Sequence, residues 1–164
     1  MAEPAALPQG DQRIVGITLD EHTVVRRNAD VEHERAVAIF DLLEENEFRP
    51  APPLGGPFHL HLSLEDNRLV LDVQTADRAP LDKIVLPLQS FRGIIKDYFM
   101  ICESYYAAIR RSSPTQIEAI DMGRRGLHNE ASDMLRERLA DRVAIDDNTA
   151  RRLFTLICVL HIRG

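Results

Sequence analysis

A basic stretch flanked by glycines holds residue types that can bind an anion or move a proton. It reads Asp121-Met-Gly-Arg-Arg-Gly-Leu-His-Asn-Glu130. Guanidinium groups bind phosphate and carboxylate through paired hydrogen bonds, and a histidine beside a carboxylate can act as an acid–base pair. The candidate ligand-binding residues are therefore Asp121, Arg124, Arg125, His128 and Glu130.

The conformation of this stretch decides what it can do, and the sequence leaves three alternatives open. On an unbroken helix, Arg124 and His128 fall within the apolar arc, so Arg124 needs a partner, which Asp121 can provide. The simplest interpretation is then a structural arginine network between helices. If Gly123 and Gly126 break the helix, the segment becomes a basic turn before a new helix that can hold phosphate or carboxylate. The third alternative is catalysis by His128 with Glu130.

A second candidate site lies in the stretch Phe58-His59-Leu60-His61-Leu62-Ser63-Leu64, where large apolar residues alternate with His, His and Ser. A strand with this alternation turns its leucines toward a core and its histidines away from it. The simplest interpretation is a solvated sheet face. With Asp72 opposite His61, the cluster His59, His61 and Asp72 could alternatively form a ligand or partner surface, or an open metal site.

Composition and charge limit the class of function. The chain has 164 residues, a formal charge of −6 and a pI near 5.5, which argues against general binding to nucleic acid. It has no apolar segment long enough to span a bilayer and no signal-peptide pattern, so we expect a cytoplasmic protein that does not bind membranes. No recognisable catalytic motif is present, so no catalytic residue, resident metal or cofactor is predicted. Cys102 and Cys158 are expected to be buried, reduced thiols.

The first half of the chain predicts an arm, a strand, a helix and a linker. We expect a flexible arm over residues 1–11, ahead of a single domain over 12–164, which begins with a strand over 12–19. Val15, Ile17 and Leu19 should share one side of that strand. A helix over 31–46 should be capped by Asp30. Its buried stripe should consist of Ala36, Ile39, Phe40 and Leu43, and residues 49–57 should form a linker loop.

Two or three strands are predicted next, over about 58–64, 68–74 and 81–86. A two-residue turn at Asp66-Asn67 pairs residues whose numbers sum to 133, which aligns the leucines of the first two strands on one face. The same register places His61 opposite Asp72 and His59 opposite Gln74.

The second half of the chain is predicted to be helical. Ser90 should cap a helix that extends to about Ile109, and Ser113-Pro-Thr-Gln116 combines a capping box with proline at the first helical position. That next helix should run to about Leu139. A last helix, capped by Asp147 or Asn148, is apolar on nearly all sides over 153–160 and should lie in the core or in a subunit interface. These elements predict an α+β fold, in which about four helices cover one face of a largely antiparallel sheet of three or four strands.

Four stretches of the chain resemble uncharacterised protein family 0262, a mostly alphaproteobacterial group. They begin at Asp30 (DVEHERAVAIF), Lys96 (KDYFMICESYY), Ile117 (IEAIDMGRRGLHNE) and Thr149 (TARRLFTLICVLH). The resemblance covers the chain from about residue 12. It implies a bacterial cytoplasmic protein of one domain, and it implies no activity, cofactor or catalytic residue.

Two hypotheses for function follow. The first is a non-catalytic accessory or interaction protein that forms a homo-oligomer through its helices. The second is a protein or enzyme that binds a small anion, phosphate or carboxylate, with Arg124, Arg125 and His128. A concave pocket around Arg124 and His128 without an internal carboxylate would favour the second, and a dry bridge from Arg124 to an acid between helices would favour the first.

Overall fold

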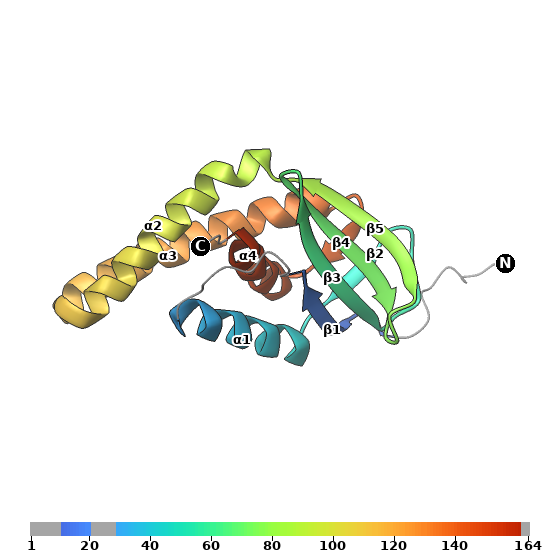
Figure 1. Ribbon diagram of the computed structural model, residues 1–164, viewed down its shortest axis with the longest axis horizontal. Coiled ribbons are helices and arrows are strands. Elements are labelled where there is room, and N and C mark those ends of the chain that lie inside the picture. Colours follow the sequence, from blue (N-terminus) through green and yellow to red (C-terminus); the bar gives the residue numbers. More distant parts are fainter. Residues whose placement is uncertain (1–10, 21–28, 162–164) are drawn as a thin grey trace.

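A mixed four-stranded sheet lies against four helices in the computed structural model, which describes residues 11–20 and 29–161 (Figure 1). This arrangement confirms the predicted α+β fold class. In chain order the described elements are β1 (Ile14–Leu19), α1 (Ala29–Glu44), β2 (Phe48–Pro50), β3 (Phe58–Glu65), β4 (Arg68–Thr75), β5 (Pro80–Pro87), the 3-10 turn η1 (Gln89–Phe91), α2 (Arg92–Arg111), α3 (Pro114–Leu139), β6 (Val143–Ile145) and α4 (Asp147–His161). Nearly all of the predicted N-terminal arm lies outside the described residues.

The main sheet has the strand order β1-β3-β4-β5, and its central hairpin has the predicted register. Leu62 pairs with Leu71, and His61 pairs with Asp72. The turn residues Asp66 and Asn67 both have positive φ, 50° and 67°, as the favoured two-residue hairpin turn requires. β1 joins β3 in parallel, so the sheet is antiparallel only from β3 to β5.

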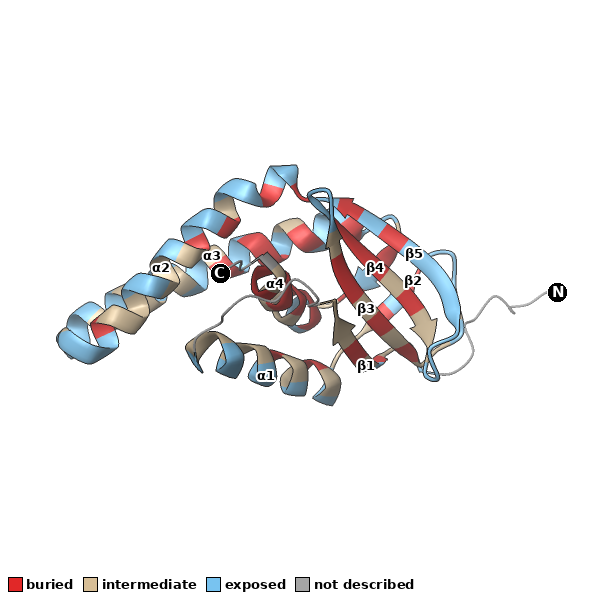
Figure 2. Cartoon of the chain, in the orientation of Figure 1, coloured by how far each residue is buried: buried red, intermediate tan, exposed pale blue. Residues whose placement is uncertain are grey.

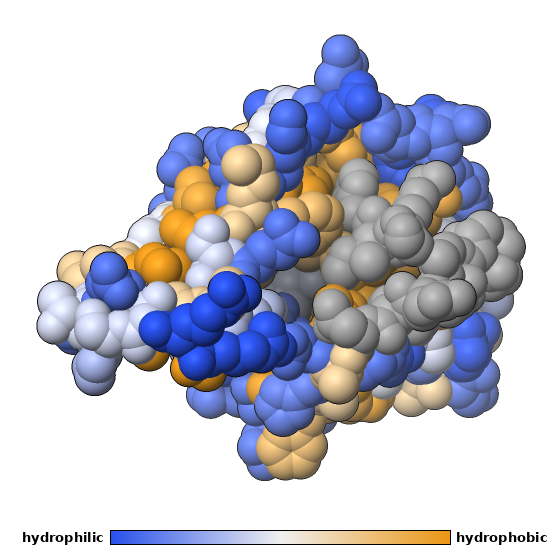
Figure 3. All heavy atoms as spheres, turned by 60° about the vertical axis from the view of Figure 1, so that its left-hand side comes forward, coloured by the Kyte–Doolittle hydropathy of each residue, from blue (hydrophilic) through white to orange (hydrophobic). Residues whose placement is uncertain are grey.

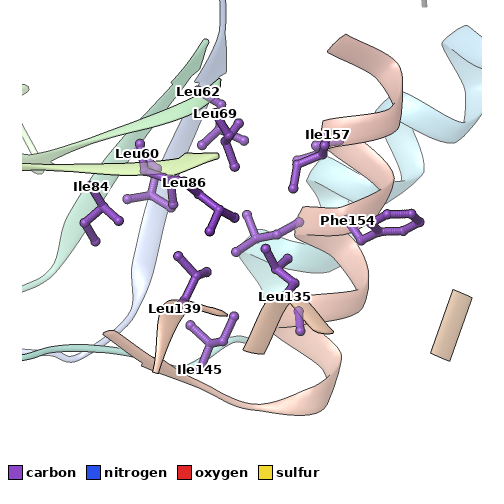
Figure 4. Close-up of a cluster of buried hydrophobic side chains, with 14 of the residues drawn as sticks. Leu60, Leu62, Leu69, Ile84, Leu86, Leu135, Leu139, Ile145, Phe154 and Ile157 are labelled. Atoms are coloured by element: carbon purple, nitrogen blue, oxygen red, sulfur yellow. The ribbon is translucent and has the colours of Figure 1, made fainter. Parts of the chain in front are cut away.

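The leucine face of the sheet forms the core together with α3 and α4. Figure 4 shows side chains of β3, β4 and β5 turned toward side chains of these two helices. The labelled residues, all of them buried, are Leu60, Leu62, Leu69, Ile84, Leu86, Leu135, Leu139, Ile145, Phe154 and Ile157. α4 is buried along most of its length (Figure 2), which confirms a core position for residues 153–160.

The first strand and first helix differ from prediction in which side they bury. An irregularity between Ile14 and Gly16 in the pairing of β1 with β3 makes Ile14 and Ile17 the buried residues and leaves Val15 exposed. In α1 the buried residues are Ala38 and Leu42.

The predicted stripe of α1 is therefore wrong at two positions, although Ile39 and Leu43 do pack against the core. Ala36 is exposed, and Phe40 is 64% exposed. The helix packs against α4, and its buried positions are Ala38 and Leu42, which lie four residues apart on one side of the helix. Asp30 lies inside the helix and is not its cap.

Two short strands were not predicted. β2 takes up the start of the expected linker over 49–57, and it pairs antiparallel with β6. Strands of three residues are too short to show a periodic pattern. The cap of α4 is also one residue earlier than expected, since Asp146 Oδ1 accepts a hydrogen bond from the Thr149 amide at 2.9 Å. Ser90 lies within η1 and does not cap α2.

α2 and α3 form a long helical hairpin that extends away from the sheet (Figure 1). The predicted capping box at Ser113 and Gln116 is present. α3 continues without a break through Gly123 and Gly126, so the alternative of a basic turn at the start of a new helix is wrong.

Candidate functional site

A cavity of about 430 Å³ lies among the four helices and is open to solvent. Each helix contributes to its lining. The lining residues are His33, Glu34, Val37, Ala38 and Asp41 from α1, Tyr98 from α2, Arg124, Arg125 and His128 from α3, and Arg151, Arg152 and Thr155 from α4. Its size lies within the range of small-molecule sites.

The charge of the lining is opposite to that of the whole chain. Four arginines line the cavity, and the carboxylates of its lining are Glu34 and Asp41. With the histidines neutral, arginines outnumber carboxylates by two, whereas the chain carries a formal charge of −6. Figure 3, in which the α2–α3 end comes forward, shows strongly hydrophilic side chains gathered beside a hollow. Such a concentration of positive charge attracts anions.

One carboxylate outside the lining holds two of these arginines. Asp121 Oδ1 accepts from Arg124 Nε at 3.0 Å and from Arg124 Nη2 at 2.5 Å. Its other oxygen, Oδ2, lies 3.0 Å from Arg125 Nε. The Asp121 side chain is 16% exposed, against 67% for Arg125, so a half-buried acid orients a guanidinium group that reaches solvent.

The arginines of α4 have different partners. Arg152 lies 3.6 Å from Asp41 of α1. Arg151 donates to the amide oxygen of Asn129 at 2.8 Å. Within the described part of the chain, no carboxylate lies within ion-pair distance of Arg151. A cationic side chain whose partner is neutral retains its attraction for an external anion.

His128 lies at the floor of the cavity. It is buried, its Nε2 is 2.9 Å from Thr155 Oγ1, and its ring contacts Tyr98 and Phe154 edge to face. Burial, together with the nearby charges of Arg151, Arg124 and Arg152, lowers the pKa of His128 to about 4. His128 is therefore uncharged at neutral pH.

Arg124 is the less exposed of the two arginines that pair with Asp121. Its guanidinium group lies 4.9 Å from the centre of the Tyr105 ring, a favourable cation–π distance. Burial lowers the pKa of Arg124, but the hydrogen bonds that its guanidinium group donates to the Asp121 carboxylate, together with the negative charge of that carboxylate, raise that pKa overall. Burial also raises the pKa of Tyr98, so its hydroxyl stays protonated.

The structure brings together most of the predicted residues of the basic stretch. Arg124, Arg125 and His128 line the cavity, with Asp121 behind them, whereas Glu130 is exposed and does not line it. The sequence analysis did not single out Glu34, Asp41, Arg151, Arg152 and Thr155. For Arg151 and Arg152 the available signal was a pair of arginines at the start of an otherwise apolar helix. Glu34 and Asp41 are on α1, and only the packing of α1 against α4 shows that they lie near these arginines.

The strand histidines form a separate cluster on the polar face of the sheet, as their register predicts. Thr18 Oγ1 lies 3.2 Å from His59 Nε2 and 2.7 Å from His61 Nδ1, and Arg78 Nη2 is 3.4 Å from the same hydroxyl. Burial, Arg78 and His61 lower the pKa of His59. Asp72 is paired across from His61. In the described residues, no three His, Cys, Asp or Glu side chains form a group that could hold a metal ion.

Cys158 is buried and Cys102 is half-buried, and both are free thiols. Burial raises the pKa of Cys102 to about 11 and raises the pKa of Cys158 well above its usual value, so both are protonated at neutral pH. None of the helices over residues 29–161 combines the length and the apolar composition needed to cross a lipid bilayer.

Comparison with known proteins identifies relatives over nearly the whole chain. The family model of Uncharacterised protein family (UPF0262) matches residues 11–163. The UPF0262 protein of Paramagnetospirillum magneticum is 62% identical over 93% of this chain and 98% of its own length. The UPF0262 protein of Rhodospirillum rubrum is 62% identical over 92% of this chain and 93% of its own length. That of Agrobacterium fabrum is 56% identical over 96% of this chain and 100% of its own length. These matches confirm the resemblance and its alphaproteobacterial range. No solved structure matched this chain.

Proposed function

We propose that this chain, which belongs to the uncharacterised protein family UPF0262, binds a small anionic ligand in the cavity between its four helices. The observation that carries the proposal is the convergence of four arginines from α3 and α4 on one open cavity of an acidic protein. Four guanidinium groups around one cavity repel one another, and the carboxylates that pair with them offset only part of that repulsion. An anion in the cavity offsets that repulsion.

The arrangement of partners favours a bound ligand over a purely internal network. Neither of the two arrangements set out above is present in full. Asp121 of the same helix pairs with Arg124, so the pocket has a carboxylate beside this arginine, but no dry acid bridge joins α3 to another helix through Arg124. Arg151 has a neutral partner, and Arg125 is mostly exposed. These two guanidinium groups retain donors that a phosphate or carboxylate can use.

The proposal is tested by titrating the purified protein with inorganic phosphate at low ionic strength and measuring the heat of binding. We expect saturable binding that weakens as salt is added, because screening reduces the attraction between charges. Arg151→Gln should weaken binding about tenfold or more, since it removes one charge-assisted contact. The matched control is Arg92→Gln, an exposed arginine at the start of α2 that does not line the cavity. Equal loss in both variants, or no binding by the unchanged protein, would contradict the proposal.

Apolar side chains that project from the helices favour a second candidate, association with another protein or with a second copy of the chain. Phe40 of α1 and Met122 of α3 are 64% and 67% exposed, and Met100 and Ile109 of α2 are also exposed. Large apolar groups in water mark interaction surfaces when they gather in a patch. The cytoplasmic location expected above suits either candidate.

Native mass spectrometry tests the association. We propose a homodimer that Phe40→Glu and Met122→Glu convert to monomer, because a charge in an apolar interface costs more than the contact returns. Val85→Glu, on an exposed apolar residue of the sheet, should leave the dimer intact. A monomeric unchanged protein rules out self-association.

A further inference from the structure

Neighbouring arginines on a helix normally diverge. Successive residues are rotated by about 100° around the helix axis, so Arg124 and Arg125 would leave α3 in different directions. Asp121 is three residues before one and four before the other, and both spacings lie on the same side of the helix. The two oxygens of its carboxylate contact one arginine each, which brings both guanidinium groups to the side of the cavity.

We propose that Asp121 is a positioning residue that sets Arg124 and Arg125 side by side to hold one phosphate-like dianion. This inference rests on the proposed function and names the class of ligand. Two adjacent guanidinium groups offer several donors to a group with three or more terminal oxygens, whereas a monocarboxylate has two oxygens and one charge. With Asp121 counted, the arginines around the cavity still outnumber the carboxylates by one, so the site remains positive.

Burial and contacts favour a positioning role for Asp121. Its side chain is 16% exposed, and Arg124, at 24%, is held by Asp121 on one side and by the Tyr105 ring on another. A guanidinium group whose rotamers are already restricted loses less entropy when a ligand binds. Arg125 is mostly exposed and contacts Asp121 through Nε, so its guanidinium group keeps donors that a ligand can use.

Positioning and simple charge attraction predict opposite effects for the loss of this acid. Removing a carboxylate makes the cavity more positive, so attraction alone predicts tighter anion binding for both Asp121→Asn and Glu34→Gln. We expect Glu34→Gln to bind inorganic phosphate about two- to fivefold more tightly. We expect Asp121→Asn to bind it more weakly, on the order of tenfold, because its arginines diverge.

The decisive measurement is calorimetry with inorganic phosphate and with acetate at about pH 8, where phosphate is a dianion. Arg125→Gln alone should weaken phosphate binding. Added to Asp121→Asn, the same substitution should have little further effect, since Asp121 acts through Arg125. If Asp121→Asn binds phosphate as tightly as Glu34→Gln does, the positioning role is overturned and the proposed function stands. If the unchanged protein binds neither anion, the proposed function itself fails.

A second variant keeps the test informative if Asp121→Asn does not fold. Arg125→Lys preserves the charge at an exposed position but replaces the planar fork with a single ammonium group. We expect several-fold weaker phosphate binding and a smaller preference for phosphate over acetate. An unchanged affinity and preference would show that charge alone is sufficient and would overturn the paired grip.

Discussion

His128 combines two features that oppose its protonation. Its ring is enclosed by Tyr98 and Phe154, and three arginines lie close enough to raise the free energy of an imidazolium. In the unfolded chain the ring returns to an ordinary pKa near 6.5. The folded protein therefore binds this proton less readily than the unfolded chain does.

A pH-dependent loss of stability follows from His128. Above pH 6.5 both states hold a neutral ring, and as the pH falls from there toward about 4 the unfolded chain takes up a proton that the folded protein refuses. We expect the free energy of unfolding to drop by up to about 1.4 kcal/mol for each pH unit in this window. Urea unfolding across the window, for the unchanged protein and for His128→Gln, isolates this contribution.

The variant should be less stable at neutral pH, where it loses the ring contacts, and should lack this part of the pH dependence. An NMR titration of the ring protons gives a direct reading. A midpoint near 6.5 for His128 in the folded protein would contradict the expected burial effect.

At the scale of single residues, the sequence predicted that Asp121 pairs with Arg124. Both belong to one helix, and helical spacing fixes their proximity. It did not predict the contribution of Arg151 or Glu34. These residues reach the cavity from helices more than a hundred positions apart in the chain, and no local spacing encodes that meeting.

Among the elements, α3 carries two glycines in an otherwise regular helix. A glycine inside a helix costs about 1 kcal/mol relative to alanine, because the unfolded chain has more freedom to lose. The capping box at its start and the packing of its second half on α4 and on β6 offset this cost, so the helix is continuous.

The two glycines should respond differently to replacement by alanine. At Gly126 an added Cβ meets nothing within 4 Å, so Gly126→Ala should raise the free energy of unfolding by about 0.5–1 kcal/mol. At Gly123 it meets Ile101 Cδ1 at 2.9 Å, which reduces the gain and makes Gly123→Ala the matched comparison. Thermal or urea unfolding at one pH measures both. A destabilised Gly126→Ala would show that something covers this side of α3.

The predictability of each element depended on the length of its pattern. The hairpin of β3 and β4 was predicted residue by residue, because alternating leucines permit one register and a two-residue turn fixes it. The predicted stripe of α1 was wrong at Ala36 and Phe40, because the helix buries Ala38 and Leu42 instead. β2 and β6 were missed because pairing between three-residue segments nearly a hundred positions apart has no local signature.

Considered as a whole, the molecule separates its two polar clusters. The histidines lie on the sheet face that points away from the core, and the arginines lie among helices that are packed on the other face. Sequence reasoning predicted both clusters and the layers that separate them. It could not predict the cavity, since a concave surface is a property of the packing of four helices and not of any one segment.

Because α4 is the last of the described elements, the cavity has an assembly order that follows translation. A nascent chain leaving the ribosome presents the arginines of α3 before those of α4 exist, and the central core remains open until Phe154 and Ile157 arrive. Binding of an anion by all four arginines would thus require that α4 has been synthesised and has packed against the other helices. A ligand present during biosynthesis would stabilise chains in which α4 has packed and would not stabilise shorter nascent chains.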